Sequence, residues 1–157
     1  IKRYKKQPSG KVFKMTMINT SPHGYQLREV APNFTANSST AVGQYLQEHI
    51  GRQLQEHFVV LSLNVALEVI SLDTIAIGQI TGVNVMPREV FQIALLNNAA
   101  SIIITHNHPS GHVLPSQTDN KFTQRLKKLS DMMHLPLRDH FIVSGKCYYS
   151  YAENEQL

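Results

Sequence analysis

Residues 101–119 read SIIITHNHPSGHVLPSQTD, and this stretch decides the fold. Three consecutive isoleucines within Ser101–Thr105 predict a buried strand, because β-branched side chains favour strands and a short apolar run is typical of a sheet interior. The strand is followed directly by the tripeptide His106-Asn107-His108. Ser116 then offers an N-cap for a helix to about Met133, since apolar residues recur at helical spacing after it. The stretch predicts a strand, a polar loop and a helix in succession.

Strands and helices alternate on both sides of this stretch. Apolar and β-branched runs predict strands over 58–63, 66–71, 74–80, 141–143 and 148–151, and an opening hairpin of 12–17 with 25–30 that turns near Ser21-Pro22-His23-Gly24. Capping residues and helical periodicity predict helices over 38–50, where Gly51 ends the helix, and over 87–98, which begins with Pro87. The sequence therefore predicts an α/β fold in which helices cover a mixed sheet, and ligands of such sheets tend to lie at strand ends.

Composition sets limits on the class of protein. A chain of 157 residues predicts one domain, and 42% hydrophobic with 17% charged residues excludes a disordered chain. We find neither the long apolar run of a membrane helix nor a signal peptide, so we expect a cytoplasmic protein without a membrane partner. The single cysteine, Cys147, excludes a thiolate-rich zinc site, and we interpret it as a structural thiol. Any metal must be held by histidine and carboxylate side chains.

Positive charge is concentrated at the start of the chain. Residues 1–14 carry six of the 15 basic side chains and no acidic one, so nine basic and all 11 acidic side chains lie elsewhere. We therefore divide the chain into a basic N-terminal arm, 1–14, and a single domain, 15–157. The arm is either a solubilising tail or a weak, nonspecific contact for nucleic-acid phosphates.

The loop after the predicted strand has the spacing of a metal site, H-x-H-x7-S-x2-D. A hydrolytic zinc site needs three nitrogen or oxygen ligands and one open position for water. Residues two apart in an extended segment point to the same side, so His106 and His108 can bind one metal ion. Asp119, in the first turn of the following helix, can supply the third ligand. One zinc ion per chain is the cofactor that this spacing indicates.

Simpler interpretations exist for the same residues. Ser116 followed by Asp119 is also a capping-box variant that requires no catalysis. The histidine pair can belong to an ordinary polar loop, in which Pro109-Ser110-Gly111 forms the turn. These interpretations must together explain why all four polar residues gather at one junction between a strand and a helix.

The segment 106–119 resembles the JAMM (MPN-plus) metal motif in the form carried by RadC-like bacterial proteins. The resemblance extends over about residues 54–153, through the stretches 56–61, 87–90, 98–100, 137–140 and 150–153. It implies a cytidine-deaminase-like three-layer fold with a mixed sheet flanked by helices. It also implies zinc held by His106, His108 and Asp119, an upstream catalytic acid, and a serine, Ser116, that assists the oxyanion.

By position in the resemblance, the upstream acid is Glu56, which precedes the strand 58–63. An exposed carboxylate beside Arg52 is the plain alternative, and Glu68 and Glu89 are the rivals. Glu89 follows Pro87 in a helix first turn, where the helix dipole alone favours an acid. Asp139 and His140 are either an outer layer of support for the metal or a satisfied polar pair at the start of a strand. His112 is expected near the substrate.

Three functions compete. The resemblance implies a zinc-dependent peptidase or isopeptidase that acts on a peptide or protein substrate. A metal-dependent protein that acts on nucleic acid in DNA repair is the second hypothesis, and the slightly acidic body of the chain argues against tight duplex binding. The third is a binding module that holds zinc without turnover. A base deaminase is excluded, because its P-C-x-x-C ligands are absent.

Overall fold

The computed structural model describes residues 4–6, 12–21, 24–29, 34–78 and 85–157 of the chain. Within these ranges, eight strands form one sheet in the order β1-β2-β3-β5-β4-β6-β7-β8. Their bounds are β1 (Tyr4–Lys6), β2 (Val12–Ser21), β3 (Gly24–Glu29), β4 (Glu56–Leu63), β5 (Val69–Gly78), β6 (Ser101–Asn107), β7 (Leu137–Val143) and β8 (Tyr148–Ser150). Neighbouring strands are antiparallel except β6 and β7, which are parallel. The sheet is therefore mixed, as predicted.

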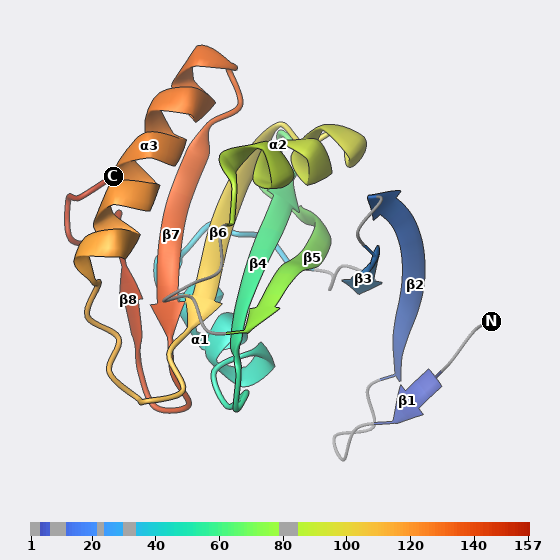
Figure 1. Ribbon diagram of the computed structural model, residues 1–157, viewed down its shortest axis with the longest axis horizontal. Coiled ribbons are helices and arrows are strands. Elements are labelled where there is room, and N and C mark those ends of the chain that lie inside the picture. The colour runs from blue at the N-terminus through green and yellow to red at the C-terminus, as the bar shows by residue number, and fades with distance from the viewer. Residues whose placement is uncertain (1–3, 7–11, 22–23, 30–33, 79–84) are drawn as a thin grey trace.

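Three helices cover the two faces of this sheet: α1 (Ser39–His49), α2 (Pro87–Leu96) and α3 (Gln117–Met132). Each face of the sheet carries its own hydrophobic core. Residues of β4 contribute alternately to the two cores, because successive side chains of a strand point to opposite faces. Val59 and Leu61 pack with residues of α1, whereas Phe58 and Val60 pack with residues of α2 and α3. The predicted α/β fold, with helices on both sides of a mixed sheet, is confirmed (Figure 1).

The end of α1 is fixed by a close approach to the end of β7. A Cβ atom added at Gly51 would lie 2.4 Å from the carbonyl oxygen of Ser144, so only glycine fits there. At the other end, the Ser38 hydroxyl accepts a hydrogen bond from the N–H of Ala41 at 3.4 Å. Both predicted ends of this helix are therefore correct.

The prediction of two strands over 66–71 and 74–80 is wrong. One continuous strand, β5, runs over Val69–Gly78, and residues 79–80 lie outside the described part of the chain. The polar residue Asp73 lies between the two predicted strands, but it is buried and hydrogen-bonded. Its carboxylate accepts from the Ser71 hydroxyl at 2.5 Å and from the Asn97 amide at 2.8 Å. A buried carboxylate with these donors need not interrupt a strand.

Several other strands are longer than the sequence predicted. β6 continues through Asn107 instead of ending before His106, and β7 begins at Leu137 instead of residue 141. The cause is ladder pairing, since Asn107 pairs with Val143 across the parallel strands. Apolar composition predicts the centre of a strand. It does not predict the polar residues at the strand ends, which join the strand because they pair with the neighbouring strand.

The N-terminal hairpin is confirmed by the antiparallel pairing of β2 with β3, while residues 22–23 of its predicted turn lie outside the described residues. The boundary at residues 14 and 15 falls inside β2, and Tyr4 of the proposed arm pairs with Lys14. The division into 1–14 and 15–157 stays a prediction. Among the described helices, none has the length and apolarity that crossing a membrane requires.

Candidate metal centre

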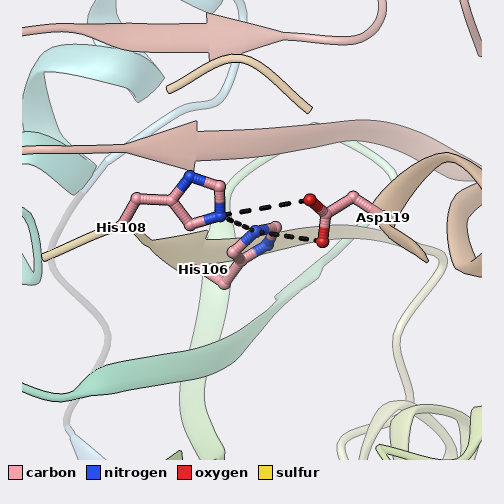
Figure 2. Close-up of side chains that lie close together, drawn as sticks. All are labelled: His106, His108 and Asp119. Carbon is pink, nitrogen blue, oxygen red and sulfur yellow. Dashed lines mark hydrogen bonds and ion pairs between the residues drawn. The ribbon is translucent and has the colours of Figure 1, made fainter. Parts of the chain in front are cut away.

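Two neighbouring elements bring the predicted ligands together. His106 lies in β6 and is buried, and the N–H of His108 continues the ladder with β7 by donating to Val143 at 2.9 Å. Because this segment is extended, the two imidazoles point to the same side. Asp119 is the third residue of α3 and is also buried. Figure 2 shows the three side chains converging from the strand and the helix.

The three ligand atoms lie at distances that suit one metal ion. Nε2 of His106 is 3.1 Å from Nε2 of His108 and 3.4 Å from Oδ1 of Asp119, and the third separation, from Nε2 of His108 to Oδ2 of Asp119, is 4.0 Å. Ligand atoms about 2.0–2.1 Å from a tetrahedral zinc ion lie about 3.3 Å apart. The cluster could therefore hold a metal ion with small adjustments of the side chains.

The loop fixes which ring nitrogen of His108 donates a hydrogen bond. Its Nδ1 lies 2.6 Å from the carbonyl oxygen of His112, which can only accept, so Nδ1 carries the proton. The other ring nitrogen, Nε2, is the one that faces His106 and Asp119. The predicted residue His112 thus contributes its backbone, while its side chain is exposed.

Burial keeps the inner histidine neutral. The pKa of His106 is lowered to about 4, chiefly because burial disfavours the charged ring; the charge of Asp119 opposes the shift and that of His108 adds to it. At neutral pH the contact between His106 and Asp119 is therefore not an ion pair. Neutral imidazole is the form that binds metal ions.

The capping interpretation of Ser116 is correct, and it orients the metal-facing carboxylate. The Ser116 hydroxyl accepts from the N–H of Asp119 at 3.1 Å, while Oδ2 of Asp119 accepts from the N–H of Ser116 at 2.8 Å. Oδ1 then faces His106. Capping is compatible with metal ligation, since one carboxylate oxygen accepts from the cap while the other faces His106.

The alternation of side chains along β4 puts Glu56 on the side of the cluster. Phe58 pairs with His106 at the end of the ladder between β4 and β6, and Glu56 lies two residues before Phe58 on the same strand. Glu56 and Phe58 share one face of the strand, and the Phe58 ring stacks on that of His106 at 6.2 Å. Glu56 is half-buried. Its assignment as a base stays a prediction.

The rival acids are used in local structure. The Glu68 carboxylate accepts from the side-chain amide of Asn64 at 2.6 Å, in the turn beyond the opposite end of β4. The Glu89 carboxylate accepts from the N–H of Met86 at 2.9 Å and closes the first turn of α2. Both carboxylates therefore have structural roles, and the choice of the base among Glu56, Glu68 and Glu89 stays a prediction.

Family comparison agrees with the site. The family model described as the RadC-like JAB domain matches residues 36–157, which include every residue of the cluster. The chain belongs to this family. Among curated relatives of this RadC-like JAB domain, UPF0758 proteins of Herminiimonas arsenicoxydans and of Janthinobacterium sp. (strain Marseille) are 43% and 41% identical over 129 residues. A UPF0758 protein of Streptococcus gordonii is 41% identical over 120 residues.

The alignments cover most of the chain but not of the relatives. The alignments to the Herminiimonas and Janthinobacterium proteins each cover 82% of this chain and 58% of the relative. The alignment to the Streptococcus protein covers 76% of this chain and 53% of the relative. The chain thus spans a little over half the length of the curated relatives it matches. The name UPF0758 assigns no activity to these relatives.

The structure separates Asp139 from His140. The Asp139 carboxylate accepts from the Ser150 hydroxyl at 2.5 Å and from the N–H groups of His140 and Ala152, so it is a satisfied structural group, although burial raises its pKa. The His140 ring points to the other face of β7, where Nε2 lies 2.9 Å from Nδ1 of His106. The satisfied polar group is thus Asp139, whereas His140 contacts a candidate ligand, and its support of a metal stays a prediction.

Sequence reasoning missed two residues of this RadC-like JAB domain site. Asn107 was taken as a loop residue, but it is buried, and its side chain hydrogen-bonds to the backbone of residues 53–57. Thr123 is buried against His140 and lies one helical turn after Asp119. The spacing of four residues was the available signal for Thr123. Nothing in the sequence indicates the partners of Asn107, which lie some 50 positions away.

A cavity opens beside the cluster. Aromatic and apolar side chains form one wall, and the Phe122 ring meets Phe58 edge-on at 5.5 Å. The complete lining is Phe58, Val85, His106, Thr118, Asp119, Phe122 and His140. Cys147 is exposed outside this lining, with its thiol 3.3 Å from the Ser144 hydroxyl.

Proposed function

We propose that this protein is a zinc-dependent hydrolase of amide bonds, a peptidase or isopeptidase acting on a peptide or protein. The convergence of His106, His108 and Asp119 beside a cavity carries the proposal. Membership of the RadC-like JAB domain family and the H-x-H-x7-S-x2-D spacing support it. Hydrolysis of an amide is the reaction that this motif implies.

The donor set fits zinc. Two neutral imidazole nitrogens and one carboxylate oxygen are ligands of catalytic zinc, which takes three protein ligands and keeps a fourth position open. Among the described residues, these three form the group that could hold one ion. Zinc bound there would supply a Lewis acid that polarises the scissile carbonyl and lowers the pKa of water.

The remaining steps belong to side chains of the chain. Glu56 would accept a proton from the attacking water and pass it to the leaving amine, as a general base and then a general acid. The Ser116 hydroxyl accepts the cap hydrogen bond through a lone pair, so its own hydrogen can point to a developing oxyanion. Both roles require the substrate carbonyl to lie between these two residues.

A metal-loading experiment combined with a substrate screen tests this proposal. We expect the purified protein to hold one zinc ion per chain, and the zinc-loaded form to cleave members of a library of peptides and isopeptide-linked conjugates. Cleavage should stop when a chelator removes the metal and return when zinc is restored. Zinc binding without cleavage of any member would instead favour a binding module, and absence of zinc binding would overturn the assignment of the site.

A further inference from the structure

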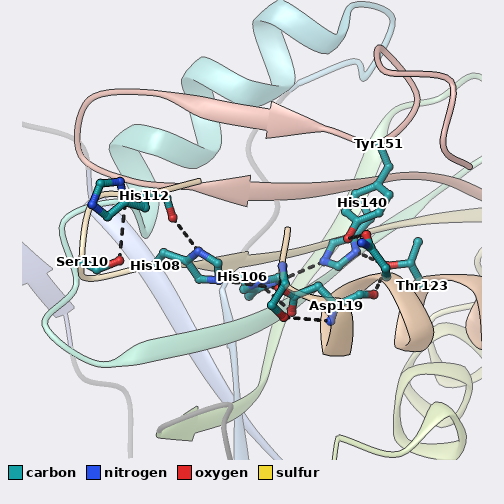
Figure 3. Close-up of polar contacts among 10 residues, drawn as sticks. His106, His108, Ser110, His112, Asp119, Thr123, His140 and Tyr151 are labelled. Carbon is teal, nitrogen blue, oxygen red and sulfur yellow. Dashed lines mark hydrogen bonds and ion pairs between the residues drawn. The ribbon is translucent and has the colours of Figure 1, made fainter. Parts of the chain in front are cut away.

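Three consecutive buried contacts run from the His106 ring to the backbone of Asp119 (Figure 3). Nδ1 of His106 lies 2.9 Å from Nε2 of His140, and Nδ1 of His140 lies 2.6 Å from the Thr123 hydroxyl oxygen. The same hydroxyl donates to the backbone carbonyl of Asp119 at 2.7 Å. The contacts therefore connect one candidate ligand to the helical turn that carries another.

Only one arrangement of protons satisfies all three contacts of this chain, from His106 through His140 and Thr123 to Asp119. A carbonyl oxygen can only accept, so the single hydrogen of Thr123 points to Asp119. Thr123 must then accept from Nδ1–H of His140. In the reverse arrangement, the lone pairs of the hydroxyl and the carbonyl would face each other at 2.7 Å without a hydrogen between them.

The direction of this first bond determines the remaining ones. A neutral His140 that carries its proton on Nδ1 has a bare Nε2, which must accept from Nδ1–H of His106. A neutral His106 that carries its proton on Nδ1 has a bare Nε2. That atom is the one facing His108 and Asp119.

Burial prevents water from replacing these hydrogen bonds, so the arrangement of protons is fixed. His106, Thr123 and His140 are each 1% exposed, so bulk water does not compete for their hydrogen bonds. The His140 ring also stacks on the Tyr151 ring, with centroids 4.8 Å apart and planes 4° from parallel, which holds its orientation. An unsatisfied N–H in such a place would carry the full cost of desolvation.

We propose that Thr123 and His140 are positioning residues that hold His106 in the tautomer with a bare Nε2, ready to bind the metal. The inference rests on the proposed function, since a metal ion is what this tautomer serves. The Thr123 hydroxyl sets the direction of the relay, and His140 transmits it to His106. Such outer contacts typically change metal affinity by about 10–100-fold when they are lost.

Histidine ¹⁵N NMR of the metal-free protein tests the relay directly. Above the ordinary histidine pKa of about 6.5, the ring ¹⁵N shifts show which nitrogen carries the proton. We expect both His106 and His140 to carry it on Nδ1. A wild-type spectrum with the proton on Nε2 of either ring would overturn the proposal, whatever the variants do.

Two substitutions at one position provide the matched comparison. Thr123→Val keeps the shape of the side chain but removes the hydroxyl, so we expect His140 to move its proton to Nε2 and force His106 to do the same. Zinc affinity, measured by competition with a chromophoric chelator, should fall about 10–100-fold. Thr123→Ser keeps the hydroxyl and should restore the wild-type tautomers and affinity.

Failure of the relay and failure of the proposed function have different signatures. Wild-type affinity in Thr123→Val, or equal losses in Thr123→Val and Thr123→Ser, would reject the relay even if the enzyme cleaves peptides. Conversely, the expected tautomers in a protein that binds zinc but cleaves nothing would keep the relay and reject the hydrolase.

Discussion

The side-chain carbonyl of Asn107 accepts a hydrogen bond from the backbone N–H of His57 at 2.7 Å. Its amide group donates in the other direction, to the carbonyl oxygens of Gln53 at 3.2 Å and Gln55 at 3.1 Å. These three partners lie on both sides of Glu56. The residue between the two candidate histidine ligands therefore holds the segment that carries the proposed base.

Replacement of Asn107 should affect the segment that carries Glu56 without affecting the candidate metal ligands. Asn107→Asp keeps the acceptor but turns an oxygen toward the carbonyls of Gln53 and Gln55, so we expect a loss of about 1–3 kcal/mol in the free energy of unfolding. Turnover should fall, while zinc content stays near wild type. Asn37→Asp, the same chemical change at an exposed position, is the control. Loss of zinc from Asn107→Asp would mean that Asn107 serves the ligands instead of Glu56.

Removal of a ligand should remove the metal. His106→Ala and Asp119→Ala each leave two protein donors, which cannot complete a three-ligand site. We expect elemental analysis to find far less than one zinc per chain in either variant. His134→Ala and Asp131→Ala remove an exposed histidine and an exposed aspartate of the same region, and they should keep the metal. One tightly held zinc in His106→Ala or Asp119→Ala would refute the ligand assignment.

Local patterns were sufficient to predict the parts of the site that are close in sequence. The cap of α3 at Ser116 and the placement of Asp119 in its first turn follow from side-chain chemistry within four residues. The two histidines share a side because the segment is extended. Such features depend on a few neighbouring dihedral angles, so the sequence determines them directly.

Contacts between distant strands could not be predicted in the same way. The position of His140 beside His106 depends on the parallel register of β6 and β7, which includes a shift between Ile102 and Ile103. A slip of one residue would turn the His140 side chain to the opposite face. The continuity of β5 likewise depends on donors that Asn97 brings to Asp73 from another element. Pairing of distant residues is a property of the packed core.

Stability of the metal-free protein should depend on pH. The pKa of His106 is lowered to about 4 in the folded protein by burial, so between about pH 4 and 6.5 the unfolded chain binds more protons. The free energy of unfolding therefore rises with pH through this window, and His106 alone should contribute a loss of about 2 kcal/mol from pH 7.5 to 5. Burial also lowers the pKa of His140, which adds to the same trend.

Chemical denaturation at several pH values measures this dependence. Zinc should increase stability at neutral pH and lose its effect as the pH falls, because protons compete with the metal for the ligands. His134→Ala, which removes an exposed histidine, is the control for loss of a histidine side chain. A metal-free protein whose stability is constant or greater at pH 5 would contradict the burial argument.

Any affinity for nucleic acid should reside in residues 1–14 and be nonspecific. This segment carries six positive charges, whereas the remainder has nine basic and 11 acidic side chains. With six phosphate contacts at most, the logarithm of the binding constant should fall with the logarithm of salt concentration at a slope no steeper than about −5. Fluorescence anisotropy on duplexes of different sequence, with and without residues 1–14, gives the measurement. Sequence-selective binding that survives the deletion would instead favour a nucleic-acid function for the domain.

Glu56→Gln should abolish turnover while the metal remains. Glutamine keeps the shape of the side chain but cannot accept a proton, and general-base catalysis typically contributes about 10²–10⁴-fold. We therefore expect kcat to fall by that factor on any substrate found in the screen, with zinc content and stability close to wild type. Glu68→Gln makes the same change in the turn beyond the opposite end of β4 and should retain activity.

The two readouts for Glu56→Gln distinguish the possible errors. Near-normal turnover would mean that another acid is the base. Glu89 would be tested next, because it lies in the first turn of α2, close in the chain to Val85 of the cavity lining. Loss of zinc would instead make Glu56 a fourth ligand. The coordination sphere would then be closed, as in structural zinc sites, and the hydrolase proposal would fail because no position would remain for water.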